Sequence, residues 1–258
     1  MAHTLVAVFN SIWLLIMLKY ANKFMLWLMP PLQEEKPFGP IYISESLLDT
    51  PEIALAQTRK EIVRESEIAL EMFREAITVI SENNIRLCES LCLKDVRLDT
   101  LHNAVVPYLT KLGQGTLDDD QSKEQTSLLY VTSQIEEIGD IVDKNLMPLA
   151  RKRIENNLRF SKEGWNDIVS LHGRVLNMLE KLVDAFRNND KELAQLVANS
   201  KIAIGAYESE LRKKHIARLN SGLVETLETS SIHLDIIDQF KRINSHIVSV
   251  AYIILGEI

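Results

Sequence analysis

Two pairs of acidic residues, each four positions apart, are the groups in this sequence that could do chemistry. Asp95 and Asp99 form one pair, and Glu136 and Asp140 form the other. Residues four apart share one face of a helix, where like charges repel unless a cation or a base neutralises them. Two such pairs on neighbouring helices would offer hard oxygen ligands that suit Mg²⁺, Mn²⁺ or Ca²⁺. His102, three positions after Asp99, would add a ligand suited to iron.

The same spacing has a simpler explanation, because acidic residues four apart are common on solvated helices. Lys94, Arg97 and Lys144 lie close to the acidic pairs in the sequence and could neutralise them without a metal. The positions later in the chain that correspond to Glu136 and Asp140 are Lys241 and Ser245, so we expect no second acidic site there. The sequence leaves open whether a cation is bound.

A basic run offers a second candidate site. Arg212, Lys213 and Arg218 could form a surface for an anion or an acidic partner. The alternative is ordinary pairing along one helix, since Glu208 and Glu210 each precede a basic residue by four positions. Exposed runs of charge usually solvate a helix face.

Motifs for catalysis are absent from the sequence. It contains no G-x-S-x-G, phosphate-binding glycine loop, H-E-x-x-H or C-x-x-C. Apart from His102, we expect the scattered histidines to lie at helix surfaces or bundle edges. Cys88 and Cys92, four apart, are typical of two reduced thiols rather than of a disulfide framework. We therefore expect no enzymatic activity, and a metal-dependent enzyme using the acidic residues is the least favoured hypothesis.

Long amphipathic helices must position these groups. From residue 52 onward apolar residues recur at helical spacing, and the heptad Leu55, Ile62, Ala69 and Ala76 is the clearest example. The expected helices cover 52–84, 87–112, 128–146, 154–186, 193–222 and 223–255. Helices of this length with short connections pack as antiparallel bundles. The sequence thus predicts an all-α fold of two tandem three-helix bundles, the first at 52–150 and the second at 151–258.

The first 30 residues form an apolar segment long enough to cross a bilayer. Lys19 and Lys23 are the charged residues of this segment, and Trp13 and Trp27 are suited to membrane interfaces. Because the lysines follow the main apolar run, the positive-inside rule places the rest of the chain in the cytoplasm. We therefore expect a transmembrane or membrane-associated helix; the alternative is a soluble helix packed on the domain.

The chain after this apolar segment begins with a proline-rich stretch and is acidic in its overall balance. Five of the seven prolines lie between residues 30 and 51, which predicts a linker at 31–51 rather than a helix. The formal net charge is -7. Nucleic-acid binders usually carry a basic stripe that neutralises phosphates, so nucleic acid is excluded as an expected partner.

Several segments resemble a known family. The sequence EEIGD at 136–140 is similar to the E-R-I-G-D signature of PhoU proteins, which are two tandem three-helix bundles that regulate phosphate uptake. The segments at 160–164, 215–219 and 232–246 resemble the PhoU-like tail of bacterial sodium/phosphate cotransporters. This resemblance covers roughly 52–258, and residues 2–10 resemble the start of the last membrane helix before that tail.

The resemblance implies a function and a site. PhoU proteins are implied to bind metal through E/D-x-x-x-D motifs, which here are Asp95/Asp99 and Glu136/Asp140. The implied function is that of a cytoplasmic regulatory domain at the inner membrane, belonging to a sodium-dependent phosphate transport protein. Its partner would be a transporter membrane domain or a regulatory protein. The membrane repeats of that family are missing, so we expect a truncated or split form.

The alternative is a stand-alone PhoU-type regulator of phosphate uptake that binds metal and a protein partner. A homo-oligomer is compatible with either hypothesis. The apolar segment at 1–30 favours the first, because a soluble regulator has no use for interfacial tryptophan and lysine.

Overall fold

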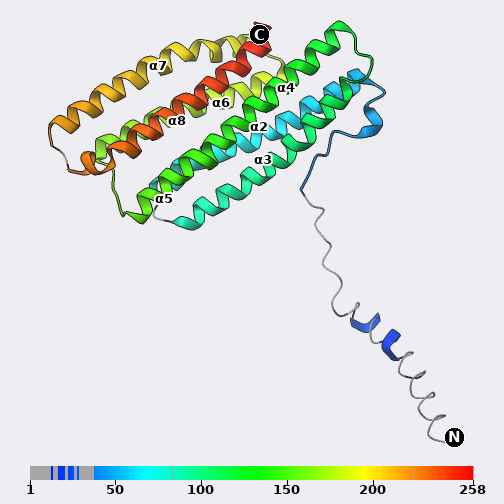
Figure 1. The fold of residues 1–258 in the computed structure, drawn as a ribbon, viewed down its shortest axis with the longest axis horizontal. Coiled ribbons are helices and arrows are strands. Elements are labelled where there is room, and N and C mark those ends of the chain that lie inside the picture. The colour runs from blue at the N-terminus through cyan, green and yellow to red at the C-terminus, as the bar shows by residue number, and fades with distance from the viewer. Residues whose placement is uncertain are drawn as a thin grey trace, which may run out of the picture. The chain divides into compact units, whose positions relative to one another are not determined.

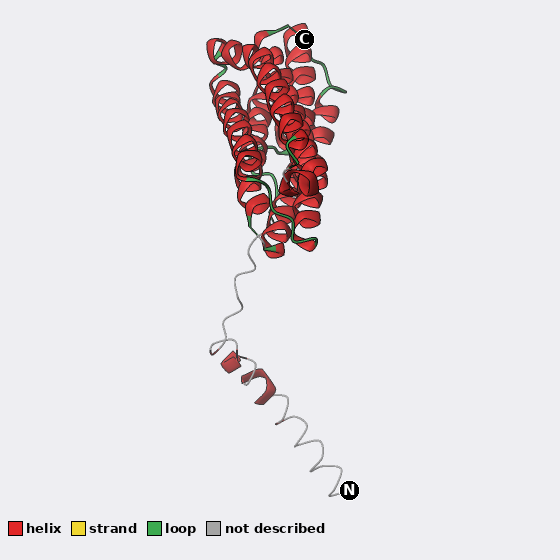
Figure 2. Ribbon diagram, turned by 90° about the vertical axis from the view of Figure 1, so that its left-hand side faces the viewer, coloured by secondary structure: helices red, strands yellow, loops and turns green. Residues whose placement is uncertain are grey.

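The computed structural model describes residues 13, 17–20, 23–25, 28, 38–82, 84–222 and 224–257. The chain divides into a short unit, Met1–Phe38, and a large unit, Gly39–Ile258. All regular elements of the described part are helical (Figure 2). The all-α expectation is therefore confirmed.

The short unit bears on the predicted membrane segment. Trp13, Lys19 and Lys23 are helical and exposed, and Trp27 lies outside the described residues. Among the described residues, no helix combines the length and the apolar character needed for a membrane span. The anchoring role of these residues stays a prediction.

The large unit consists of long helices joined by short connections (Figure 1). The elements are the 3₁₀-helix η1 (Glu45–Leu47), α2 (Pro51–Ser81), α3 (Ile85–Leu112), α4 (Asp119–Asp140), the π-helix η2 (Ile141–Leu146), α5 (Met147–Glu155), α6 (Lys162–Asn188), α7 (Lys191–Asn220) and α8 (Val224–Leu255).

Polar caps explain where most of these helices begin. The side chains of Asn84, Ser161 and Asp190 each accept a hydrogen bond from a backbone N–H in the first turn of α3, α6 and α7. Asp118 and Gln121 form a capping box at the start of α4. This helix therefore begins well before the predicted position 128, where the apolar pattern starts.

Two three-helix bundles pack side by side. In the first, α2, α3 and α4 contact one another; in the second, α6, α7 and α8 do so. Across the junction α2 packs on α6, and α4 packs on α8 (Figure 1). At the centre Phe73 of α2 is fully buried against His172 of α6 and Phe240 of α8, with ring centroids 4.6 and 5.4 Å away. The expectation of tandem three-helix bundles is confirmed.

One predicted helix is wrong in its extent. The apolar pattern predicts a single helix over 154–186, but the chain leaves α5 after Glu155 and starts α6 only at Lys162. Asn157 takes a φ of 49°, a left-handed conformation that asparagine tolerates and that ends α5. Ser161 then caps α6. The predicted boundary between residues 150 and 151 falls inside α5 and stays a prediction.

A buried carboxylate of α2 bonds to the backbone of the described part of the predicted linker. Glu61 accepts hydrogen bonds from the backbone N–H groups of Ile41 (2.9 Å) and Tyr42 (2.8 Å), and it pairs with Arg64. Because these bonds fix an otherwise irregular segment, Glu61→Ala should speed amide hydrogen exchange at residues 41 and 42 by about tenfold. The matched control is Glu52→Ala, an exposed glutamate of the same helix. Unchanged exchange in the Glu61 variant would show that other contacts hold the segment.

Candidate metal site in the first bundle

Three of the predicted acidic residues meet between α3 and α4. One carboxylate oxygen from each of Asp95, Asp99 and Asp140 lies within 4.8 Å of the others. Asp95 and Asp99 come from successive turns of α3, and Asp140 is the last residue of α4. In the part of the chain that the structure describes, Glu136 and His102 do not belong to this group. Carboxylate oxygens at this spacing are the ligands that hard divalent cations prefer.

Asp95 is the member of the group that most needs a partner. Its side chain is 5% exposed, and its Oδ1 is buried without a hydrogen bond among the described residues. Buried polar atoms are nearly always paired with protein, water or an ion. The residues therefore fit a bound cation, which would satisfy this oxygen.

Gly139 allows the two helices to come this close. A Cβ atom at this position would lie 2.9 Å from Leu98 Cδ1 and 3.3 Å from Asp95 Oδ1. Any larger residue would have to displace the Leu98 side chain and shift the Asp95 carboxylate by a few tenths of an ångström. The glycine of the EEIGD segment thus belongs to the site through packing, without being a ligand.

The electrostatics of the site oppose an ionised Asp95 in the absence of a cation. Burial raises the pKa of Asp95 to about 7, helped by the negative charges of Asp99, Asp143 and Asp140. Burial also raises the pKa of Glu136, and the charge of Asp140 adds to this effect. A divalent cation would reverse both effects, because an opposite charge favours the ionised carboxylate.

Lys144 supplies part of the neutralising charge. Its Nζ forms an ion pair with Asp140 Oδ1 at 2.5 Å, and this acidic partner raises the pKa of Lys144. The side chain of Lys144 is more than half exposed, whereas Asp95 is buried. The lysine therefore neutralises charge at the exposed edge of the cluster. Lys94, also considered from the sequence, pairs with Glu71 and Glu75 of α2 instead. A basic neighbour thus forms an ion pair with Asp140, whereas no basic side chain of the described residues forms one with Asp95.

The site lies where α4 changes into a π-helix. Residues Ile141–Leu146 form the wider turn that follows Asp140, and α5 continues from it. Turns of this kind occur often at functional sites. Asp143, within the turn, adds its charge to that of the cluster. Burial, together with a hydrogen bond to Asp143, raises the pKa of the Cys92 thiol to about 11. This thiol therefore stays protonated.

A buried glutamate next to the cluster was not found from the sequence. Glu65 of α2 is fully buried, and its Oε2 accepts a hydrogen bond from Thr132 Oγ1 at 2.7 Å. His102 Nδ1 lies 3.4 Å from Glu65 Oε1 and 3.2 Å from Thr132 Oγ1. The carboxylate of Glu65 beside it raises the pKa of His102, while burial raises the pKa of Glu65. His102, a predicted candidate ligand, is thus tied to Glu65.

The basic run of the second bundle is largely paired with acidic side chains. Arg212 pairs with Glu208 and Asp238, and Arg218 Nη2 lies 2.7 Å from Asp167 Oδ2. Lys213 is exposed. The pairing that the sequence offered as the alternative is therefore present, and the use of this surface for an anion or partner stays a prediction.

Three histidines expected at surfaces or edges are in fact buried. His172, His215 and His233 are at most 4% exposed. His172 Nε2 lies 2.8 Å from the carbonyl oxygen of Phe73, and the rings of His215 and His233 stack at 4.6 Å. The expectation is wrong because hydrogen-bond partners on neighbouring helices make a buried imidazole acceptable, and a linear sequence does not display such partners.

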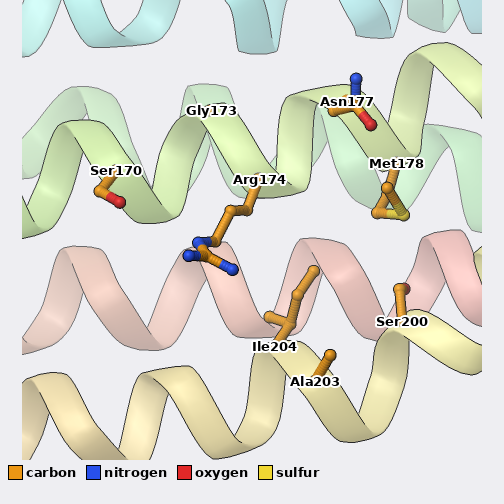
Figure 3. A pocket seen from close by; sticks show the side chains of 8 residues that line it. All are labelled: Ser170, Gly173, Arg174, Asn177, Met178, Ser200, Ala203 and Ile204. Atoms are coloured by element: carbon orange, nitrogen blue, oxygen red, sulfur yellow. The ribbon is translucent and has the colours of Figure 1, made fainter.

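A groove also runs between α6 and α7, away from the acidic cluster (Figure 3). It has a volume of about 500 Å³ and is lined by Ser170, Gly173, Arg174, Asn177, Met178, Ser200, Ala203 and Ile204. The guanidinium of Arg174 reaches from α6 towards α7 and lies 4.0 Å from the centroid of the Tyr207 ring. Arg174, the charged residue among those that line the groove, is therefore already engaged in a cation–π contact.

The fold and the cluster define a tandem three-helix-bundle protein with an acidic site between two helices of its first bundle. The sequence matches the model of the PhoU domain family at residues 62–145 and again at 168–254. These two matches cover well over half of the chain, one in each bundle. The chain belongs to the PhoU domain family.

Solved structures share this fold. The fold is similar to the crystal structure of PhoU from Pseudomonas aeruginosa, with a TM-score of 0.72 at 14% identity over 78% of this chain and 95% of that one. The phosphate transport system regulatory protein PhoU from Streptococcus pneumoniae gives a TM-score of 0.70 at 18% identity, over 80% of this chain and 95% of that one.

Relatives in the enteric bacteria are named putative inorganic phosphate export protein YjbB. The protein from Salmonella typhimurium is 27% identical over 84% of this chain, and that from Escherichia coli K12 is 26% identical over the same share. The chain spans 40% of the length of these relatives.

Proposed function

We propose that this chain is a regulatory domain of a phosphate transport system. The observation that carries the proposal is the presence of both PhoU repeats in a fold that resembles a phosphate transport regulatory protein. The relatives named as phosphate export proteins support the same process. Regulation rather than catalysis is also consistent with a site that offers carboxylates for a cation and no activated nucleophile.

The finer proposal is that the domain acts on a membrane transporter, to which it is bound or joined. Its support is the match to relatives that are longer than this chain and are named for phosphate transport. Sodium dependence and the inner membrane as its location rest on the sequence resemblance alone. A stand-alone regulator that binds a protein partner is the second candidate, favoured by the similarity to PhoU over 95% of those solved chains.

The experiment is phosphate flux in the cells that encode the chain. Removing the gene and restoring it should change the rate of radioactive phosphate uptake or efflux about fivefold, since coupling between a regulator and its target commonly reaches this size. Uptake and efflux are measured separately at low and high external phosphate. Equal rates with and without the gene under all conditions would overturn the proposal. Crosslinking in the intact cells then separates the candidates, because a transporter-bound domain should be recovered with a phosphate transporter.

We further propose that Asp95, Asp99 and Asp140 hold a divalent cation, with Glu136 and Glu65 close by. Mg²⁺, Mn²⁺ or Ca²⁺ suits three carboxylates, and iron would need His102 to leave Glu65. The buried, unpaired Oδ1 of Asp95 supports this proposal. Such a cation would cross-link α3 to the end of α4.

A further inference from the structure

A pocket lies where the two bundles meet, at the end of α2 and the start of α6. It has a volume of about 550 Å³ and is lined by Ile80, Ser81, Arg153, Arg159, Phe160, Lys162 and Trp165. This volume is within the usual range of small-molecule sites. The pocket is separate from the acidic cluster, and nothing in the proposed function uses it.

The charged side chains that line the pocket are all basic. Arg153 is 5% exposed and is held in place by donating hydrogen bonds to the carbonyl oxygens of Ser81 (3.2 Å), Glu82 (2.9 Å) and Leu158 (3.2 Å). Arg159 and Lys162 are exposed, and within the described part of the chain neither forms an ion pair. Two exposed cations beside a fixed guanidinium attract an anion, and phosphate groups suit this combination.

The other side of the pocket is aromatic. The rings of Phe160 and Trp165 are nearly parallel, with centroids 6.0 Å apart and an interplanar angle of 19°. Phe160 also packs edge-on against His233, which in turn stacks on His215. Burial lowers the pKa of His233 to about 4, so this ring supports the aromatic pair as a neutral group. A flat ring that enters the pocket finds an ordered surface on which to stack.

We propose that this pocket binds a nucleotide. The base stacks on the Phe160 and Trp165 rings, and the phosphate groups contact Arg159 and Lys162. Basic side chains next to aromatic rings are the combination by which proteins hold phosphate and base together. Because Ser81 of the first bundle and Trp165 of the second both line the pocket, a bound nucleotide would lie at the junction of the two bundles. The inference goes beyond the proposed function and does not depend on it.

The test is isothermal titration of the full chain with ADP, GDP, pyrophosphate and adenosine. We expect ADP or GDP to bind, and pyrophosphate and adenosine each to bind about tenfold more weakly or worse, because each lacks one half of the recognised chemistry. Arg159→Ala with Lys162→Ala should weaken the diphosphates at least about tenfold and leave adenosine unchanged. Both residues are exposed, so this double variant should fold normally.

Trp165→Ala should reduce diphosphate binding to the level of pyrophosphate. The matched control is Arg174→Ala in the groove of Figure 3, which removes an arginine next to an aromatic ring outside the pocket and should change nothing. Two outcomes would overturn the inference. One is the absence of binding by ADP and GDP up to about 1 mM, the weak limit of specific recognition. The other is equal affinity for pyrophosphate and ADP, which would mean an anion site without base recognition.

Discussion

Asp95→Asn should abolish stabilisation of the protein by Mn²⁺ or Mg²⁺ and, without metal, raise the free energy of unfolding at pH 8 by about 1–3 kcal/mol. In the metal-free parent at this pH, the buried carboxylate must ionise beside three other acidic groups. Asparagine has nearly the same shape and no charge. In the parent protein, metal at about 100 times its dissociation constant should add about 2.7 kcal/mol, which the variant should lack.

The pH dependence has a definite sign. The folded-state pKa of Asp95 is about 7, above the ordinary aspartate value of 3.8. At pH below both values the carboxyl group is protonated in both states, and parent and variant should differ little. As pH rises from about 4 to about 7, the unfolded chain releases the proton while the folded chain retains it, so the parent loses stability relative to the variant. Metal affinity should fall as pH drops below about 7, because the proton competes for the ligand oxygen.

The measurement is urea unfolding with a chelator at pH 4 and pH 8, and thermal unfolding with and without metal. Asp120→Asn is the matched control, because that side chain is 97% exposed and should change neither quantity. If the Asp95 variant is still stabilised by metal, the ligand assignment is wrong. If it is less stable than the parent at pH 8 without metal, an unidentified partner holds the Asp95 carboxylate.

Phe73→Ala should cost about 3–5 kcal/mol of stability, the range for removing a fully buried phenylalanine. The ring fills the junction between α2, α6 and α8, and a cavity there weakens the contact of one bundle with the other. Urea unfolding followed by circular dichroism measures the loss. Tyr130→Ala, which removes a ring that is 55% exposed, should change stability by less than about 0.5 kcal/mol. A loss below about 1 kcal/mol for Phe73→Ala would show that the two bundles are stable independently of this junction.

The helical architecture could be predicted from the sequence because burial follows a regular spacing. The heptad Leu55, Ile62, Ala69 and Ala76 is fully buried, as its period requires. The break between α5 and α6 could not be predicted in this way, because the apolar spacing continues across 154–165. Local conformation decides the break: Asn157 favours the end of one helix, and Ser161 favours the start of the next. In this segment the helix-capping residues outweigh the apolar periodicity.

The acidic cluster was predictable in part for a similar reason. Asp95 and Asp99 share a helix face by their spacing, and packing of neighbouring helices brings Asp140 to them. Glu65 was missed because no spacing distinguishes it from the other glutamates of α2; its burial depends on His102 and Thr132 of other helices. The stacked imidazoles of the second bundle, which come from different helices, are hidden for the same reason. Sequence periodicity identifies faces, whereas pairings across faces depend on the three-dimensional packing.

The π-helical turn after Asp140 amounts to a one-residue insertion in an otherwise continuous helix. If residues 141–146 wound as an ordinary α-helix without losing a residue, everything after them would rotate by about 100°. Arg153 would then swing away from the carbonyl oxygens of Ser81 and Glu82 that it now reaches. The wide winding of this short segment therefore sets the angular register between the acidic cluster on one side and the junction of the bundles on the other.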